Sequence, residues 1–331
     1  MKQVKTSIAL ATYNGGKYLK AQLESFLNQT CKPDELIISD DGSSDDTLSI
    51  IRNFSKISPF PVILSQNERN LGYGGNFNQA LMKTNGDLVF LSDQDDVWYP
   101  NKIERILRFS EKNKDALVLM NDAALTDGEL NRSGFTKLGQ IRSAGFSEST
   151  FVMGACLAVR RELLNVCLPI PEKYHAHDSW IAGIAEGMNR KDILPIVLQD
   201  YRRHGGNESR WLVNSTSRIT RWHAVIDDIR TCYSLYKGRY ETFSADDRNL
   251  EMDLIMLSWA ESICKENIST LVEDISRLAS ILRKKNKLQV GRMKIRELDF
   301  IPRLRAIFKF WRAGNYQSYS GIKSAIRDLF L

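Results

Sequence analysis

Residues 88–98 have the sequence LVFLSDQDDVW, in which a short apolar run is followed at once by a cluster of acids. The run Leu88–Leu91 is typical of a strand buried inside a parallel sheet. Ligands of open parallel sheets bind beyond the carboxyl ends of the strands, so the acids stand where a site is expected. This stretch therefore predicts both a buried strand and a candidate site.

Similar runs occur on either side, and segments with helical periodicity separate them. Between the runs, apolar residues recur at helix spacing, as at Leu19, Leu23 and Phe26. A Gly-rich loop over residues 70–75 precedes a helix that carries Phe77. This alternation predicts an α/β fold, with a mostly parallel sheet flanked by helices. The other strand-like runs are residues 8–11, 36–38, 61–64 and 116–120.

Strand-like runs stop after about residue 215, and helical patterns dominate from there. We therefore expect an α/β domain over residues 1–215 and a helical region over residues 216–331. Residues 280–331 contain 13 Lys or Arg and 3 Asp or Glu, within a chain of net charge +6. Three interpretations compete for this basic, amphipathic end: a solvated helical surface, a surface that packs on the first domain, or peripheral contact with an anionic membrane. No nucleic-acid partner is expected.

The N-terminal sequence bears on location in the cell. Residues 1–5 lead into a strand-like run without the apolar region of a signal peptide, and no stretch of about 18 apolar residues occurs. We expect a cytoplasmic protein, either free or held at the inner face of the cell membrane.

Two further predicted strands end in polar clusters. The first is followed by Thr12-Tyr13-Asn14-Gly15-Gly16 and the second by the acidic segment 39–46. Because Asp and Ser are good turn and N-cap residues, an ordinary helix cap is an alternative explanation for the second cluster.

The acids Asp93 and Asp95 are harder to explain as a plain loop. Crowded carboxylates repel one another and need a cation or a partner, and in an extended chain these two would point to the same side. Their oxygens suit Mg²⁺ or Mn²⁺ bridging the phosphates of a nucleotide. Two alternatives are a solvated acidic loop and the Asp-x-Asp signature of aspartyl-phosphate phosphotransferases, which residues 89–97 nearly match. That signature belongs on a first strand, however, and about 90 residues precede it here.

Taken in order, these motifs resemble glycosyltransferase family 2 over residues 5–210. The resemblance implies a GT-A-like (Rossmann-like) fold. The form of residues 93–98 and the later Tyr201-Arg202-Arg203-His204 resemble the rhamnosyltransferase-like branch of bacterial surface-polysaccharide synthesis. The motifs are Thr12-Tyr13-Asn14-Gly15, Gln29-Thr30, Asp40-Asp41-Gly42-Ser43, Asn70-Leu71-Gly72, Asn76-Phe77 and Asp93-Gln94-Asp95-Asp96-Val97-Trp98.

The resemblance implies a nucleotide site and a metal site. The implied nucleotide-binding residues are Thr12 and Tyr13 at the base, the adjacent Asn14, Asp41 as acceptor of a base N–H, Asp93 near the ribose or the metal, and Arg202 or Arg203 at the phosphates. The implied ligands of Mn²⁺ or Mg²⁺ are Asp93, Asp95 and His204.

For the catalytic base the resemblance implies Asp178, and for the acceptor side it implies Gly154, His177 and Trp180. An inverting transfer needs a carboxylate that takes the proton of the acceptor hydroxyl. The chain departs from the family's usual pair of acids by having His177, which puts the role of that neighbour in doubt. Two alternatives are a helix N-cap at Asp178 and a zinc site formed with His175.

Together these observations predict a metal-dependent, inverting glycosyltransferase. Its donor would be a nucleotide diphosphate sugar, with dTDP-L-rhamnose as the first candidate and a UDP-hexose as the alternative. Its acceptor would be a lipid-linked glycan or an oligosaccharide, in the synthesis of bacterial O-antigen, capsule or cell-wall polysaccharide.

Overall fold

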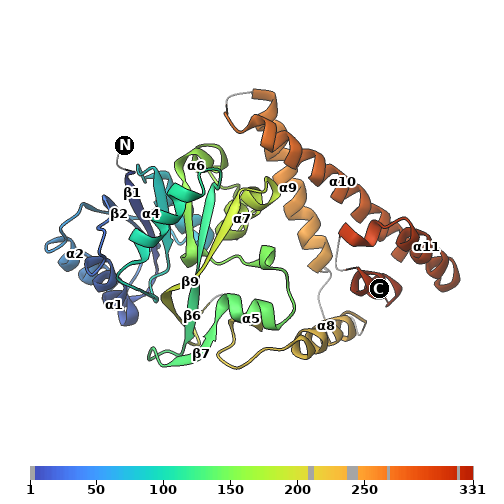
Figure 1. Ribbon diagram of the computed structural model, residues 1–331, viewed down its shortest axis with the longest axis horizontal. Coiled ribbons are helices and arrows are strands. Elements are labelled where there is room, and N and C mark those ends of the chain that lie inside the picture. Colours follow the sequence, from blue (N-terminus) through green and yellow to red (C-terminus); the bar gives the residue numbers. More distant parts are fainter. Residues whose placement is uncertain (1–3, 208–211, 237–244, 267–268, 319–320, 331) are drawn as a thin grey trace. The chain divides into compact units, whose positions relative to one another are not determined.

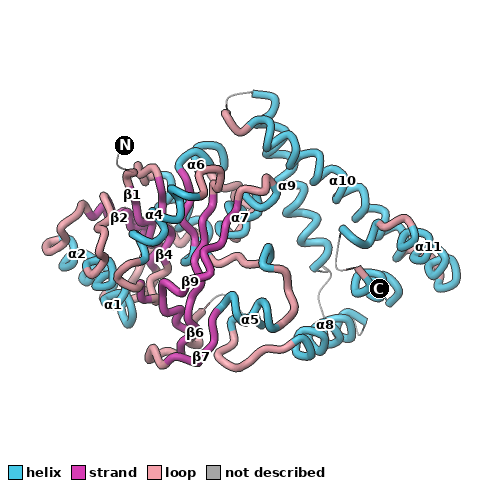
Figure 2. The backbone as a smooth tube through the Cα atoms, viewed as in Figure 1, coloured by secondary structure: helices cyan, strands magenta, loops and turns pink. Residues whose placement is uncertain are grey.

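The computed structural model describes residues 4–207, 212–236, 245–266, 269–318 and 321–330. The chain divides into two compact units, unit 1 (Met1–Arg221) and unit 2 (Trp222–Leu331). Every described strand lies in unit 1, whereas the described elements of unit 2 are helices (Figure 1, Figure 2).

Unit 1 is built on one sheet with the strand order β3-β2-β1-β4-β8-β6-β9-β5, and β7 pairs with β6. The α/β class is confirmed, and β1 to β4 pair in parallel as expected. β8 runs antiparallel to both β4 and β6, so the sheet is mixed beyond β4. A buried apolar run does not encode the direction of its strand, so the alternation alone overestimated the parallel part. The strands are β1 (Thr6–Thr12), β2 (Glu35–Asp40), β3 (Val62–Gln66), β4 (Leu88–Ser92), β5 (Val97–Trp98), β6 (Val118–Thr126), β7 (Arg132–Thr136), β8 (Leu157–Arg160) and β9 (Lys191–Arg202).

Helices cover both faces of the sheet in unit 1. On one face Ile8 and Leu10 of β1 form a core with Phe26, Phe54 and Ile106, which come from α1, α2 and α4. The alternate strand residues point to the other face, and α3 packs against β1 and β2. The α-helices of unit 1 are α1 (Gly16–Leu27), α2 (Thr47–Ser55), α3 (Gly72–Met82), α4 (Lys102–Lys112), α5 (Lys137–Ser143), α6 (Arg161–Cys167) and α7 (His177–Gly187).

The parallel register aligns the carboxyl ends of three neighbouring strands. Thr12 at the end of β1 lies opposite Asp40 of β2, and Leu10 lies opposite Ser92, the last residue of β4. The loops that follow these strands therefore meet at one edge of the sheet.

Unit 2 consists of helices, most of them long. α9 and α10 pack together, and α11 and α12 both contact α10. No helix in the described parts of the chain is both long enough and apolar enough to cross a membrane. The helices are α8 (Arg221–Tyr236), which begins at the boundary, α9 (Ala245–Glu266), α10 (Val272–Arg296), α11 (Phe300–Arg312) and α12 (Ile322–Phe330).

A buried polar network joins α10 to α12. The guanidinium of Arg292 donates two hydrogen bonds to the carboxylate of Asp328, at 2.8 and 2.9 Å, and neither side chain reaches solvent. Arg296 and the hydroxyl of Tyr316 donate to the same carboxylate at 2.8 Å each. The carboxylate of Asp328 thus accepts four hydrogen bonds from three side chains in the interior of unit 2.

We predict that Asp328→Ala lowers the free energy of unfolding by about 3–5 kcal/mol, because the buried guanidinium of Arg292 would lose the carboxylate to which it donates two hydrogen bonds. Urea unfolding followed by circular dichroism measures the loss. Glu297→Ala removes the same charge from the exposed end of α10 and should change stability by about 0.5 kcal/mol or less. Equal losses in the two variants would contradict this role of the network.

Candidate active site

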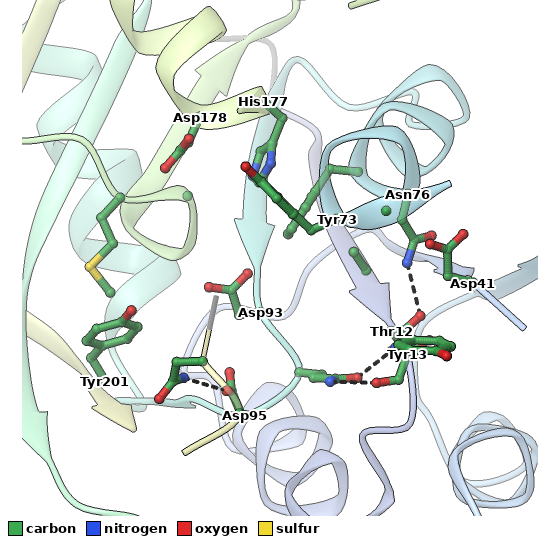
Figure 3. A pocket seen from close by; sticks show the side chains of 18 of the residues that line it. Thr12, Tyr13, Asp41, Tyr73, Asn76, Asp93, Asp95, His177, Asp178 and Tyr201 are labelled. Carbon is green, nitrogen blue, oxygen red and sulfur yellow. Dashed lines mark hydrogen bonds between the residues drawn. The ribbon is translucent and has the colours of Figure 1, made fainter. Parts of the chain in front are cut away.

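A cavity of about 520 Å³ opens where the ends of β1, β2 and β4 meet. Figure 3 shows its polar side chains, with Thr12, Tyr13 and Asp41 on one side, Asp178 and His177 on the other, and Asp93 between them. The predicted site residues that line the cavity are Thr12, Tyr13, Asp41, Asp93, Asp95, Gly154, His177 and Asp178.

Hydrogen bonds between the loops fix the Thr12 side of the cavity. The amide of Gln94 pairs with the main chain of Tyr13, accepting from its N–H at 2.9 Å and donating to its carbonyl at 3.0 Å. Asn76 of α3 donates to the carbonyl of Thr12 at 3.0 Å. The loop after β1 is therefore tied both to the acidic turn and to α3, while the ring of Tyr13 is left at the rim, 48% exposed.

Asp41 is buried and oriented by its neighbours. Its carboxylate accepts hydrogen bonds from the amide of Asn67 at 2.9 Å and from the main-chain N–H of Leu71 at 3.0 Å. Asn14, predicted to lie at the same nucleotide site, does not line the cavity. Its side-chain oxygen accepts from the N–H of Ser44 at 2.9 Å, so it links two loops instead.

The chain turns at residues 94–95, so the acidic segment is not extended. Asp96 points into the protein, where it accepts from Gln199 at 2.8 Å and from the main-chain N–H of Arg202 at 3.1 Å. Burial and the charges of Asp95 and Asp93 raise its pKa well above the ordinary value. Asp96 thus anchors the turn to β9 while the other two acids face the cavity.

Asp93 is a cavity acid whose surroundings disfavour its ionised form. No described residue donates a hydrogen bond to its carboxylate. Burial, reinforced by the negative charges of Asp95 and Asp178, raises its pKa to about 7. A cation entering the cavity would relieve this repulsion, because an opposite charge favours the ionised carboxylate.

Asp95 contacts His204, which itself does not line the cavity. The Nε2 of His204 lies 2.8 Å from a carboxylate oxygen of Asp95, and Asn207 donates to the same oxygen at 3.2 Å. The ring of His204 packs on Tyr18, with centroids 4.7 Å apart.

The side chains at the acidic turn suit a metal ion only in part. Across the described residues, no three His, Cys, Asp or Glu side chains are grouped closely enough to hold a metal by themselves. The zinc alternative at residues 175–178 therefore has no support. Asp93 and Asp95 remain suitable in kind for a hard divalent cation whose other ligands come from a phosphate or water, as is common for Mg²⁺.

The two predicted phosphate-binding arginines lie beside the cavity but do not line it. Arg202 donates to the carbonyls of Asp95 and Gly128, at 2.7 and 2.6 Å, and its guanidinium packs over the ring of Tyr18. Arg203 donates to the hydroxyl of Tyr201 at 3.2 Å. In this arrangement Arg202 supports the acidic turn, which the sequence motif does not reveal.

The opposite wall is formed by the first turn of α7. Asp178 lies there, exposed to the cavity, and the adjacent His177 is buried with its ring stacked on Phe77 at 3.9 Å. Burial lowers the pKa of His177, against the opposing effect of Asp178, so the ring is neutral at neutral pH. Neither ring nitrogen has a hydrogen-bond partner within the described structure. Gly154 lies close by, since a Cβ there would stand 2.8 Å from Nε2.

The structure corrects the prediction that Trp180 lies on the acceptor side. Its ring is fully buried, packs edge-on against Tyr174 and donates to the carbonyl of Cys167 at 2.9 Å. Trp180 follows Asp178 by two residues, about 200° around the helix axis, so the two side chains lie on opposite faces of α7.

Lys137 is a cavity residue that the sequence does not single out. It lies at the start of the short helix α5, and its ammonium donates to the side chain of Asn214, which also lines the cavity. Burial lowers its pKa to about 7. No motif surrounds Lys137, and only the packing of α5 carries it into the cavity.

Similarity to solved structures defines the class of protein. The chain resembles S. aureus TarS (residues 1–349) in complex with UDP, with a TM-score of 0.52 and 16% identity, over 98% of this chain and 89% of that one. It also resembles the mannosyltransferase PcManGT from Pyrobaculum calidifontis in complex with GDP-Man and Mn²⁺, with a TM-score of 0.50 and 16% identity, over 99% and 88%. The fold is therefore the GT-A fold of glycosyltransferases.

Sequence similarity then defines the family. The family model "Glycosyl transferase family 2" matches residues 7–168. The chain is 39% identical to the UDP-Glc:alpha-D-GlcNAc-diphosphoundecaprenol beta-1,3-glucosyltransferase WfaP of Escherichia coli, over 67% of this chain and 86% of that protein. It is 24% identical to an Escherichia coli UDP-Gal:alpha-D-GlcNAc-diphosphoundecaprenol beta-1,3-galactosyltransferase, over 72% and 86%. The chain belongs to glycosyltransferase family 2, as its motifs predict.

Gly74 offers a test of how the two walls are held. It lies in the first turn of α3, which begins at Gly72 and so includes part of the expected loop. A Cβ at Gly74 would stand 2.0 Å from the carbonyl oxygen of His175, three residues before Asp178. We predict that Gly74→Ala lowers the rate of sugar transfer about 100-fold by displacing Asp178. Gly205→Ala, which meets nothing within 4 Å, should keep a near-normal rate, and an equal loss there would contradict the explanation.

Proposed function

We propose that this enzyme is a metal-dependent, inverting glycosyltransferase that extends a lipid-linked glycan in the synthesis of a bacterial surface polysaccharide. The observation that carries the proposal is the placement of Asp178 and the nucleotide-side residues on opposite sides of one cavity, with Asp93 of the acidic turn between them. A donor held at the turn would present its anomeric carbon towards Asp178, with the acceptor entering between them.

In the proposed reaction the carboxylate of Asp178 takes the proton of the acceptor hydroxyl. The oxygen then forms a bond to the anomeric carbon, and the bond from that carbon to the donor diphosphate breaks on the opposite face. The products are the extended glycan and a nucleoside diphosphate. Thr12, Tyr13 and Asp41 would hold the base of the donor. The two hydrogen bonds between the amide of Gln94 and the main chain of Tyr13 keep this side of the cavity in place.

We assign Asp93 and Asp95 to a divalent cation, Mn²⁺ or Mg²⁺, with His204 held against Asp95 beside it rather than grouped with the two acids as a third ligand. When bound, such an ion stabilises the negative charge of the departing diphosphate. The raised pKa of Asp93 and the contact of Asp95 with His204 support the assignment. The complex of PcManGT with Mn²⁺ makes it plausible for the fold. Arg203 would add positive charge near the phosphates, and Arg202 would hold the turn.

For the donor we propose a UDP-hexose, because both Escherichia coli relatives are named for UDP-sugars. dTDP-L-rhamnose, which the sequence motifs favour, is the second candidate. The same relatives are named for an N-acetylglucosamine-diphosphoundecaprenol acceptor, which supports a lipid-linked acceptor and work at a membrane surface. Gly154 and His177 lie where such an acceptor would contact the wall beside Asp178.

We predict that Asp178→Asn lowers the rate of transfer by about 10²–10⁴-fold, since the amide cannot accept the hydroxyl proton. Donor binding should stay within about threefold, because Asp178 lies on the wall opposite the nucleotide residues. Release of nucleoside diphosphate and calorimetry measure the two quantities. Glu186→Gln, an exposed acid of the same helix, is the matched control and should be active. Normal turnover of Asp178→Asn would exclude it as the base.

A second prediction concerns the donor and the metal. Calorimetry with UDP-glucose, UDP-galactose, UDP-N-acetylglucosamine and dTDP-L-rhamnose should show one preferred donor in the presence of Mn²⁺. Chelation should weaken its binding by about tenfold or more, because the acids of the turn then face the diphosphate without a counter-charge. Asp95→Asn should weaken the metal dependence. Equal donor binding with and without chelator would contradict the metal assignment.

A further inference from the structure

Helix α11 of unit 2 exposes an apolar face. None of its residues is buried, and the large side chains along one side are substantially exposed. Successive members lie one, three or four residues apart, so they form one continuous stripe along the helix. They are Phe300 (62%), Ile301 (62%), Leu304 (41%), Phe308 (66%) and Trp311 (43%).

The other side of α11 is fixed to unit 2. The ring of Phe310 packs edge-on against Tyr316, with centroids 5.0 Å apart. Arg303 donates to the carbonyls of Leu298 and Leu329 at 3.0 and 3.3 Å. Trp311, at the end of the stripe, also lies against Tyr316, with centroids 6.0 Å apart, and keeps 43% of its surface exposed. The attachment of the opposite face holds the rest of the apolar stripe outwards.

A basic stripe runs beside the apolar one. Arg305, Lys309 and Arg312 are exposed, and no acid occurs in α11 itself. None of the three is paired with an acidic side chain in the described part of unit 2. The surface thus combines unpaired positive charge with contiguous large apolar groups, the composition of helices that lie in a membrane interface.

The chemistry of the two stripes selects the occupant. A second copy of the chain would bring the same three cations against one another, so self-association through this face is opposed by like charge. An anionic lipid surface provides negative headgroups for the basic stripe and an apolar layer for the other. At about 1.5 Å per residue the helix is roughly 20 Å long, too short to cross a bilayer but long enough to lie along it.

We propose that α11 docks the protein on an anionic lipid surface. The apolar stripe would insert below the lipid headgroups, and the basic stripe would lie among the headgroups. The apolar stripe is Phe300, Ile301, Leu304, Phe308 and Trp311, and the basic stripe is Arg305, Lys309 and Arg312. The inference rests on the proposed function only in its purpose, which is to hold the enzyme where a lipid-linked acceptor resides. Binding to lipid itself requires neither donor nor acceptor.

The first experiment measures cosedimentation of the full chain with vesicles of phosphatidylglycerol and phosphatidylcholine, without donor or acceptor. The double variant F308S/W311S should bind at least tenfold more weakly than the unmodified chain. The matched control is L254S/I281S, which removes two equally exposed apolar side chains from α9 and α10 and should bind normally. Absence of binding by the unmodified chain, or equal loss in the control, would overturn the proposal.

The second experiment separates α11 from the general basic character of the C-terminal region. R305Q/K309Q/R312Q should lose roughly 100-fold in affinity for vesicles rich in phosphatidylglycerol, at about a factor of five per charge. K284Q/K287Q/K294Q removes the same charge from exposed positions of α10 and should lose much less. Equal losses would mean that the whole basic region binds diffusely, which would overturn a specific role for α11.

Two further readouts complete the test. Bromine-labelled lipids should quench the fluorescence of Trp311, as judged against W311F, and no difference would count against insertion. Size-exclusion chromatography should show no shift between the unmodified chain and F308S/W311S, and a change of oligomeric state would assign the face to self-association instead.

Transfer to a water-soluble acceptor should be unchanged in F308S/W311S. If the unmodified chain transfers sugar but does not bind vesicles, the docking proposal is overturned and the proposed function stands. If it binds vesicles but transfers no sugar to any acceptor, the proposed function is contradicted and the docking proposal stands.

Discussion

Mutual repulsion among three carboxylates in one turn is the constraint around which unit 1 is arranged. Asp93, Asp95 and Asp96 stand within four residues at the end of β4. Asp96 is turned inwards and satisfied by Gln199 and by the main chain of Arg202, and Arg202 in turn donates to the carbonyl of Asp95. The end of β9 therefore holds the turn in a shape that it would not keep alone, and the unrelieved charge is left at the cavity.

The same constraint explains why the later strands of unit 1 are needed for the site. The proposed nucleotide residues Thr12, Tyr13 and Asp41 all lie at or directly after the ends of β1 and β2, but β9 holds the acidic turn. β9 pairs with both β5 and β6, so it connects the acidic turn to the strands that carry the opposite wall. Gly74 lies against the main chain ahead of α7, which sets the distance between the walls. Cavity width and charge are thus fixed by contacts between segments more than 90 residues apart in the sequence.

Much of the structure from β1 to β4 in unit 1 could be predicted from the sequence, because the apolar runs and the polar clusters after them are local features. The apolar runs of β1, β2 and β4 are buried, and the polar clusters after them lie at the cavity, as the rule for parallel sheets requires. The direction of β8, the burial of Trp180 and the arrival of Lys137 in the cavity could not be predicted in this way. Each depends on which distant segment packs against it, and neither periodicity nor a motif records that choice. The turn at residues 94–95 could not be predicted for a related reason, since contacts with β9 set its shape.

The polar network of unit 2 has a consequence for synthesis on the ribosome. Arg292 and Asp328 are 36 positions apart, so Arg292 leaves the ribosome on the order of seconds before its counter-charge. During that interval the guanidinium must stay hydrated, and α10 cannot close over it. Unit 1, whose internal contacts all lie upstream, can complete its core in the meantime. The nascent chain therefore completes the core of unit 1 first, and the closed packing of α10 against α12 follows only after Asp328 has emerged.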